Sequence, residues 1–271
     1  MPSAEMFRIT EKQSVKYLEC TAAQELDFVI HAFCTRQSGV SGGSFASLNV
    51  SAREGDGNDL VRQNIERIAA AFGISVSQFL LVCQVHRDGV WVIDGETPLS
   101  AHEPSPECDA IVTDRPGSAL CIKTADCVPV FLADPLRRVI GAVHAGWKGT
   151  ALQIVEKAVK EMVQRFGACP SDLLAVIGPS IGPCCYEVDT GVYQAMHHHP
   201  SRDAYFSAGR QAGRWMLNLS LANRYQLLSC GLLPEHIRTA DHCTACHPDL
   251  FFSHRAQGGN TGRQLNFIMI R

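Results

Sequence analysis

The stretch "TADCVPVFLADPLRRVIGAVHAGWKGT", residues 124–150, holds two apolar runs, and each of them adjoins a side chain that can bind a metal. Cys127 directly precedes the run "VPVFLAD" (128–134), and His144 directly follows the run "RVIGAV" (138–143). Short continuous apolar runs bounded by polar residues predict buried strands. We therefore expect a thiol and an imidazole at points where two buried strands meet loops.

The same patterns, followed outward along the chain, predict a mixture of strands and helices. Strands are predicted over residues 79–86, 109–114, 119–126, 128–134, 138–146, 173–179 and 264–270. Helices are predicted over residues 59–72, 150–166 and 219–230, where apolar residues recur with helical spacing and a glycine follows. Thr150 is the candidate N-cap of the second helix. Because strands and helices do not alternate regularly, the order favours a layered α/β or α+β fold over a doubly wound sheet.

Composition limits the classes of partner. The 271-residue chain is 46% hydrophobic and 19% charged, with a net charge of −3, which does not indicate nucleic acid or anionic membrane as the main partner. No apolar run reaches the ~18 residues of a membrane span, and the first twenty residues lack the apolar region of a signal peptide. We expect a cytoplasmic protein whose twelve cysteines are mostly reduced thiols.

A third candidate ligand is His86, which closes the apolar run 79–85 in the same way that His144 closes its own. Two imidazoles and a thiolate suit zinc, and three protein ligands leave a fourth position open, as in catalytic zinc sites. Such a site lowers the pKa of a bound water to about 7. The alternative is that the three residues are ordinary core or surface residues, because no short motif joins them.

The segment "GWKGT" (146–150) joins a strand to the start of a helix and carries Lys148. Free backbone N–H groups at a helix start favour anions, and the ammonium adds positive charge. The segment is not a phosphate-binding Walker loop, because Trp147 stands where the lysine of that motif should be. A solvated lysine is the alternative interpretation.

Two further cysteine motifs have no assigned role. Cys184 and Cys185 are adjacent in the rigid turn "GPSIGPCCYEV", whose glycines indicate a close backbone approach. Cys243 and Cys246 belong to "CTACH", the form of c-type haem attachment, but haem attachment requires export and we find no export signal. A second zinc site, a redox dithiol and a chance occurrence remain open for the second motif.

Seven motifs, taken together, resemble the YfiH-like family, also called multicopper polyphenol oxidase or laccase-domain proteins. They are "TRQSGVSGGSFASLNV", "QVH", "CDAIVTD", "TADCVPV", "VHAGWKGT", "IGPSIGPCCYEV" and "FFSHR…TGRQLN", in that order from Thr35 onward. The resemblance implies one domain over residues 1–271, with a layered α/β/β/α sandwich similar to a toxin cysteine-hydrolase fold. It also implies that zinc is bound by His86, Cys127 and His144. The sequence departs from the family at "DHCTACHPDLFFSHR", which is richer in Cys and His.

The activities that the resemblance implies are purine nucleoside phosphorolysis, adenosine deamination and cleavage of methylthioadenosine. For phosphorolysis, phosphate is the co-substrate, and Arg36 and Lys148 are the candidate phosphate ligands. One alternative is a copper-dependent polyphenol oxidase, although multicopper chemistry needs more histidines in paired motifs. Another is peptidoglycan-precursor editing or a cysteine hydrolase, with Cys127 as nucleophile and His144 as its partner.

Overall fold

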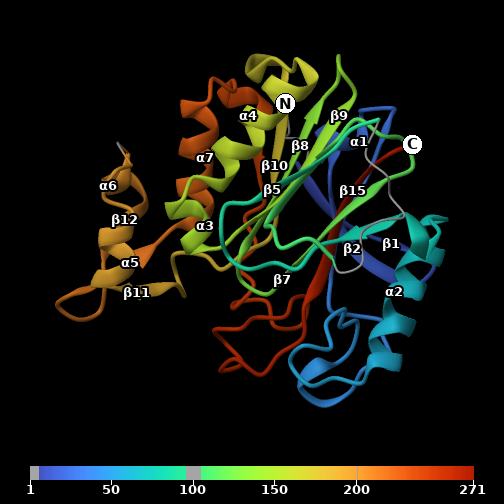
Figure 1. The fold of residues 1–271 in the computed structure, drawn as a ribbon. Coiled ribbons are helices and arrows are strands. Elements are labelled where there is room, and N and C mark those ends of the chain that lie inside the picture. Colours follow the sequence, from blue (N-terminus) through green and yellow to red (C-terminus); the bar gives the residue numbers. More distant parts are fainter. Residues whose placement is uncertain (1–5, 96–104, 200) are drawn as a thin grey trace, which may run out of the picture.

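The computed structural model describes residues 6–95, 105–199 and 201–271. Two six-stranded sheets form its centre, and a three-stranded sheet lies at one side (Figure 1). No helix in these three ranges is both long enough and apolar enough to cross a membrane.

The first sheet runs in the order β1-β2-β3-β15-β7-β4. Its strands are β1 (Phe7–Lys12), β2 (Val15–Cys20), β3 (Val29–Cys34), β15 (Gln264–Ile270), β7 (Ala119–Thr124) and β4 (Phe79–Leu81). Neighbouring strands pair antiparallel except β4, which is parallel to β7 at the edge.

The second sheet runs in the order β14-β10-β8-β9-β6-β5. Its strands are β14 (Ile237–Thr239), β10 (Leu174–Ile177), β8 (Val128–Asp134), β9 (Val139–Ala145), β6 (Ala110–Thr113) and β5 (Val90–Ile93). The small sheet contains β11 (Glu187–Asp189), β13 (Arg214–Leu217) and β12 (Phe206–Ala208).

The helices are short apart from three. They are α1 (Thr21–Gln24), α2 (Asn58–Phe72), α3 (Trp147–Ala151), α4 (Ile154–Phe166), α5 (Thr190–Ala195), α6 (Arg202–Tyr205) and α7 (Leu219–Ser229). Single 3₁₀ turns occur at η1 (Gly43–Phe45), η2 (Val76–Gln78), η4 (Pro170–Asp172) and η5 (Pro234–His236).

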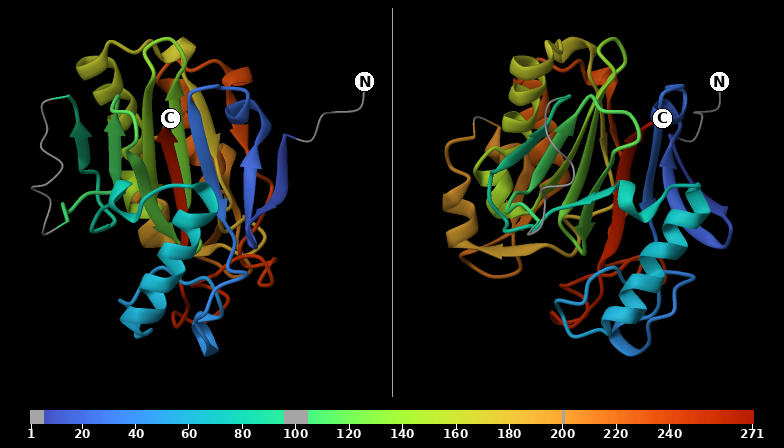
Figure 2. Two further views of the ribbon diagram at one scale, coloured as in Figure 1. Left: turned by 90° about the vertical axis from the view of Figure 1, so that its right-hand side faces the viewer. Right: turned by 45° about the vertical axis from the view of Figure 1, so that its right-hand side comes forward.

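The two large sheets pack face to face, and helices cover both outer faces (Figure 2). Alternating side chains of each strand explain this arrangement, because neighbours along a strand point to opposite faces. On β8, Phe131 faces the layer between the sheets, where its ring stacks on Phe33 of β3 with centroids 4.5 Å apart. Val130 and Leu132 face the other way and pack under α4 and α7.

The outer face of the first sheet is covered by α2, whose buried residues include Ile68 and Phe72. That helix ends at Gly73, whose φ of 68° lies in the left-handed region that glycine adopts without strain. The order of layers is therefore α/β/β/α, and the expected mixed α/β sandwich is confirmed.

The predicted elements match this structure unevenly. The strand predictions over 128–134 and 264–270 coincide with β8 and β15, and the helix over 219–230 corresponds to α7. The predicted helix over 150–166 is wrong as a single element, because Gln153 takes a left-handed φ of 61° and separates α3 from α4. Thr150 is consequently inside α3, not an N-cap.

Candidate metal centre

The three predicted ligands meet at one end of the sandwich. The ligand atoms of His86, Cys127 and His144 all lie within 4.8 Å of one another. Cys127 lies between β7 of the first sheet and β8 of the second, and His86 lies on the link from β4 to β5, which also passes between the sheets. His144 is the sixth residue of β9, paired with Pro129 two residues beyond Cys127. The convergence of these three side chains was predicted, and the structure brings them together.

The backbone at this point is held in unusual conformations. His86 has a φ of 57° and Asp126, the residue before Cys127, has a φ of 87°. Non-glycine residues in this region cost about 1–3 kcal/mol each and persist only where other contacts enforce them. For Asp126 those contacts are Thr244 Oγ1 and the Arg255 backbone N–H, which donate to its carboxylate at 2.6 and 2.7 Å.

Asp109 belongs to the candidate site, although no local sequence pattern marks it. Its buried carboxylate accepts a hydrogen bond from His144 Nδ1 at 2.8 Å. The same carboxylate accepts the backbone N–H groups of Val85, His86 and Arg87, at 3.2, 3.0 and 2.8 Å. A carboxylate in this position fixes the imidazole ring and its tautomer, which leaves Nε2 of His144 as the atom that could bind a metal. Asp109 therefore orients one candidate ligand, His144, and anchors the turn that carries another, His86.

The electrostatics of the cluster favour a thiolate. Burial alone would raise the pKa of Cys127, but the adjacent His144 and His86 outweigh it and lower the pKa to about 6. Burial alone would lower the pKa of His144, whereas the Cys127 thiolate and Asp109 raise it to about 9. A thiolate and two imidazoles that converge from separate loops form a donor set that fits zinc or another borderline-soft divalent metal.

Gly146 explains how the ligands approach so closely. A Cβ atom at this position would lie 3.0 Å from the Cys127 sulfur and 3.3 Å from Cδ2 of His86. Any side chain two positions after His144, in the motif "HAGW", would therefore crowd Cys127 and His86 and force them to shift.

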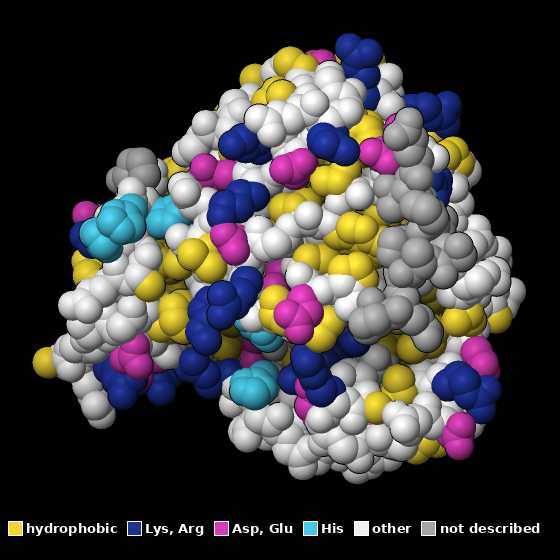
Figure 3. Space-filling model, viewed as in Figure 1, with side chains coloured by type: hydrophobic (Ala, Val, Ile, Leu, Met, Phe, Trp, Pro, Cys, Tyr) yellow, Lys and Arg dark blue, Asp and Glu magenta, His cyan; other side chains and the backbone are white. Residues whose placement is uncertain are grey.

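A cavity of about 780 Å³ opens over the cluster, within the size range of small-molecule sites. Its described lining residues include four cationic side chains (Arg53, Lys123, Arg255 and Arg263) and two carboxylates (Glu54 and Asp126). Apolar lining comes from residues such as Trp147, Ile181 and Leu219. Figure 3 shows Lys and Arg side chains on both sides of the hollow in which histidine is visible. The excess of positive charge suits an anionic ligand.

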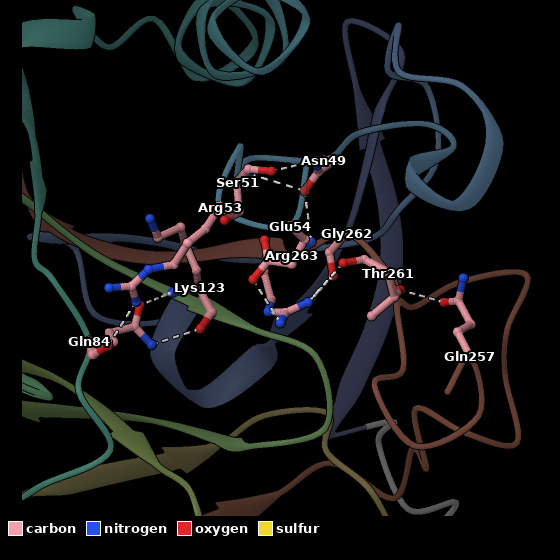
Figure 4. Close-up of polar contacts among 10 residues, drawn as sticks. All are labelled: Asn49, Ser51, Arg53, Glu54, Gln84, Lys123, Gln257, Thr261, Gly262 and Arg263. Carbon is pink, nitrogen blue, oxygen red and sulfur yellow. Dashed lines mark hydrogen bonds and ion pairs between the residues drawn. The ribbon is translucent and has the colours of Figure 1, made fainter. Parts of the chain in front are cut away.

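The cations of the cavity differ in how they are bound (Figure 4). Arg263 is held by Glu54 at 2.9 Å and by the carbonyls of Thr261 and Gly262, so its guanidinium is largely occupied. Among the described residues, the Lys123 ammonium has no hydrogen bond or ion pair, and burial lowers its pKa. The second oxygen of Glu54, Oε2, is buried and has no hydrogen-bond partner in the described part of the chain.

Arg36 and Lys148, the two sequence-based phosphate candidates, are not among the described residues that line this cavity. Arg36 donates from Nε to the carbonyl of Ala46 and from Nη1 to the carbonyl of Pro248, and its guanidinium lies over the Phe252 ring. Lys148 is exposed in α3, with its ammonium 5.6 Å from the Trp147 ring centroid. A phosphate role for either residue stays a prediction.

The fold and the site together define a layered α/β protein with a candidate mononuclear His₂Cys metal centre. The chain belongs to the family described as multi-copper polyphenol oxidoreductase laccase, which it matches over residues 30–271.

Several relatives of this chain carry the name purine nucleoside phosphorylase. The chain is 43% identical over 247 residues to purine nucleoside phosphorylase ORF3 of Streptomyces griseus, covering 88% of this chain and 93% of that protein. It is 37% identical over 245 residues to purine nucleoside phosphorylase YlmD of Bacillus subtilis, covering 89% and 88%. It is 34% identical over 253 residues to the human purine nucleoside phosphorylase LACC1, covering 90% of this chain but only 56% of the human protein.

Solved structures agree with this fold. The crystal structure of the Bacillus licheniformis hypothetical protein YfiH matches with a TM-score of 0.91 at 33% identity, covering 99% of this chain and 100% of that chain. The crystal structure of YlmD from Geobacillus stearothermophilus matches with a TM-score of 0.90 at 33% identity, covering 99% and 100%.

Proposed function

We propose that this chain is a zinc-dependent purine nucleoside phosphorylase that also deaminates adenosine and cleaves methylthioadenosine. The observation that carries the proposal is the convergence of His86, Cys127 and His144 beside a cationic cavity of about 780 Å³. The names of the relatives support the substrate class, since three of them, at 34–43% identity, are called purine nucleoside phosphorylases.

In phosphorolysis, a phosphate oxygen forms a bond to C1′ of the ribose while the bond from C1′ to the purine nitrogen breaks. The products are the free base, which gains a proton, and ribose 1-phosphate. Zinc, when bound by His86, Cys127 and His144, supplies Lewis-acid polarisation of a substrate oxygen. The protein must place phosphate and ribose side by side, and this placement falls to the other lining residues.

The Lys123 ammonium and the exposed Arg53 guanidinium would hold the phosphate, since both line the cavity and neither is in an ion pair in the described structure. The unpartnered Oε2 of Glu54 would accept a hydrogen bond from a ribose hydroxyl. The apolar lining at Trp147 and Leu219 would contact the purine ring. The hydrogen bond from Nδ1 of His144 to Asp109 keeps the imidazole ring fixed during the reaction.

The test measures phosphorolysis and deamination on the same variants. Purified protein with inosine and phosphate should form hypoxanthine and ribose 1-phosphate, and chelation of zinc should abolish the reaction. Lys123→Met should raise the KM for phosphate about 10- to 100-fold, the effect of losing a hydrogen bond to a charged group. Arg36→Ala and Lys148→Ala test the sequence-based candidates in the same assay. Deamination needs no phosphate, so an equal loss of both activities in Lys123→Met would contradict a phosphate role for Lys123.

A second candidate function rests on the order of side chains Cys127, His144 and Asp109. This order matches a cysteine hydrolase, in which a thiolate is activated by an imidazole that a carboxylate orients. Alkylation separates the two functions. A zinc-bound Cys127 thiolate should be protected until the metal is removed, whereas a free nucleophile should react at once whether or not zinc is added.

A further inference from the structure

A second group of metal-binding side chains lies outside the site described above. The sulfur atoms of Cys184, Cys185, Cys243 and Cys246 all lie within 4.8 Å of one another. Cys246 is 3.6 Å from the sulfur of Cys184 and 3.4 Å from that of Cys185. Four thiols from two distant parts of the sequence thus converge on one point.

The topology explains why the two cysteine pairs meet. Cys184 and Cys185 follow β10, and Cys243 and Cys246 follow β14. These strands are parallel neighbours, with Ile177 opposite Thr239, so the loops leave the same end of the second sheet side by side. A further parallel bridge between Ser180 and Cys243 continues the alignment up to the cluster.

The backbone around the four cysteines allows the two cysteine pairs to lie close together. Each pair belongs to a tight turn, with the N–H of Cys185 donating to the carbonyl of Gly182 and the N–H of Cys246 donating to that of Cys243. A Cβ atom on Gly182 would lie 3.2 Å from Cβ of Cys243 and 3.3 Å from the sulfur of Cys184, so any other residue would push the two turns slightly apart. The N–H of Gly182 also donates to the Cys243 sulfur at 3.2 Å, a contact that stabilises a thiolate.

We propose that these four cysteines form a second, structural zinc site. Zinc–sulfur bonds of about 2.3 Å in a tetrahedron place the sulfur atoms about 3.8 Å apart, close to the separations in this cluster. Four protein ligands close the coordination sphere, so this site holds structure and does no chemistry. Each of the four thiols gives up its proton when the zinc–sulfur bonds form.

A disulfide explains the arrangement less well. Cys246 is almost equally far from Cys184 and Cys185, and both separations greatly exceed the bond length of about 2.0 Å, so no pair is selected. A single disulfide would also involve only two of the four converging thiols.

The site bears on the candidate metal centre through Asp126. Thr244, between the two cysteines of the second turn, donates to the Asp126 carboxylate, and the N–H of Ile181 donates to the Asp126 carbonyl at 2.9 Å. Asp126 precedes the ligand Cys127. Zinc at the four cysteines would therefore fix two of the segments that hydrogen-bond to the strained residue beside Cys127.

Cobalt titration tests the site without interference from the first one. In Cys127→Ser protein, kept reduced with a non-thiol reductant, Co²⁺ should bind at about one equivalent per chain with the visible absorption of tetrahedral thiolate ligation. Adding Cys243→Ser and Cys246→Ser together removes two of the four thiols and should abolish that absorption, whereas adding Cys169→Ser, an exposed cysteine outside the cluster, should leave it unchanged. Absence of the absorption in Cys127→Ser, or its undiminished persistence after the double replacement, would overturn the proposal.

A second measurement keeps all four cysteines of the cluster, so it does not depend on whether a variant of the cluster folds. In zinc-loaded Cys127→Ser protein, the exposed Cys184 and Cys246 should be alkylated roughly tenfold more slowly, or slower still, than after chelation. Equal rates, or a disulfide at Cys246 found by mass spectrometry in zinc-saturated protein, would refute the site. Neither result depends on the nucleoside activity, so this proposal can fail while the proposed function stands.

Discussion

The replacement Asp109→Asn is the sharpest test of the metal centre. In the wild-type protein one carboxylate oxygen accepts His144 Nδ1 and the His86 N–H, and the other accepts the N–H groups of Val85 and Arg87. Asparagine keeps the shape but replaces one oxygen with an NH₂ group. In either orientation of the amide, the NH₂ group faces N–H donors and cannot accept their hydrogen bonds.

The magnitude follows from these contacts. Burial alone would raise the pKa of Asp109, but His144 and the backbone N–H groups lower it, so the native residue is a carboxylate. Loss of a carboxylate behind a ligating histidine costs about 10- to 100-fold in metal affinity. That factor corresponds to about 1.4–2.8 kcal/mol. The unsatisfied donors should lower the free energy of unfolding by about 1–3 kcal/mol.

The assay is zinc competition against a chromophoric chelator, with unfolding by urea measured in parallel. Asp134→Asn is the matched control, because Asp134 is also buried and accepts the N–H groups of Leu136 and Arg137 at 2.8 and 2.9 Å. It lies at the far end of β8, about 23 Å from Cys127 at about 3.3 Å per residue. Both N–H groups donate to Oδ1 of Asp134, and Oδ2 has no hydrogen-bond partner in the described part of the chain, so asparagine can keep both hydrogen bonds. The control should therefore retain its zinc affinity and most of its stability. A wild-type zinc affinity in Asp109→Asn, or an equal loss in both variants, would refute the reasoning.

Three further predictions concern single positions. His86→Ala and Cys127→Ala should each abolish metal-dependent turnover while the circular dichroism spectrum stays native, because an open catalytic site contributes less to folding than a closed one. Wild-type turnover in either variant would contradict a role for the replaced residue in the metal centre. Gly146→Ala should weaken zinc binding, since the added Cβ would crowd Cys127 and His86. Gly42→Ala should leave zinc binding unchanged, because no atom lies within 4 Å of the added Cβ. Calorimetric titration measures the zinc affinity of both variants. Burial lowers the pKa of His31 to about 4, below the 6.5 of the unfolded chain, so stability should fall by up to about 3 kcal/mol as the pH drops from about 6.5 to about 4. Urea unfolding should show this fall in the wild type and a smaller one in His31→Gln, and identical pH profiles would contradict it.

The sequence predicted the elements whose signals are local. An unbroken apolar run marked β8, and helical spacing followed by a glycine marked α2. The break at Gln153 carries no such signal, because glutamine has no preference for a left-handed φ and tertiary packing imposes it. The strands of the small sheet, which are three or four residues long, also carry no local signal, since they exist only through pairing with distant partners.

The residues of the candidate site likewise divide into those that a local sequence pattern reveals and those that only the folded structure reveals. His86, Cys127 and His144 could be found because each adjoins an apolar run and matches a motif of the family. Asp109 opens the run "DAIVT", but an aspartate before a strand is common, and only the pairing of β6 with β9 shows what it contacts. Lys123 and Arg53 lie in the cavity through contacts with Gln84, which no spacing along the chain predicts.

Two of the three candidate ligands lie on connections that pass from one large sheet to the other, and the third lies on a strand of the second sheet alone. The relative positions of the metal-binding atoms therefore depend on how the two sheets are placed relative to each other. The stacked rings of Phe33 and Phe131 help to set that spacing from within the hydrophobic interior. A substitution such as Phe131→Leu, which touches no ligand, should change the ratio of zinc to cobalt affinity as well as stability. For an engineer who wishes to alter metal preference, the interior between the sheets is thus as useful a place to mutate as the ligands.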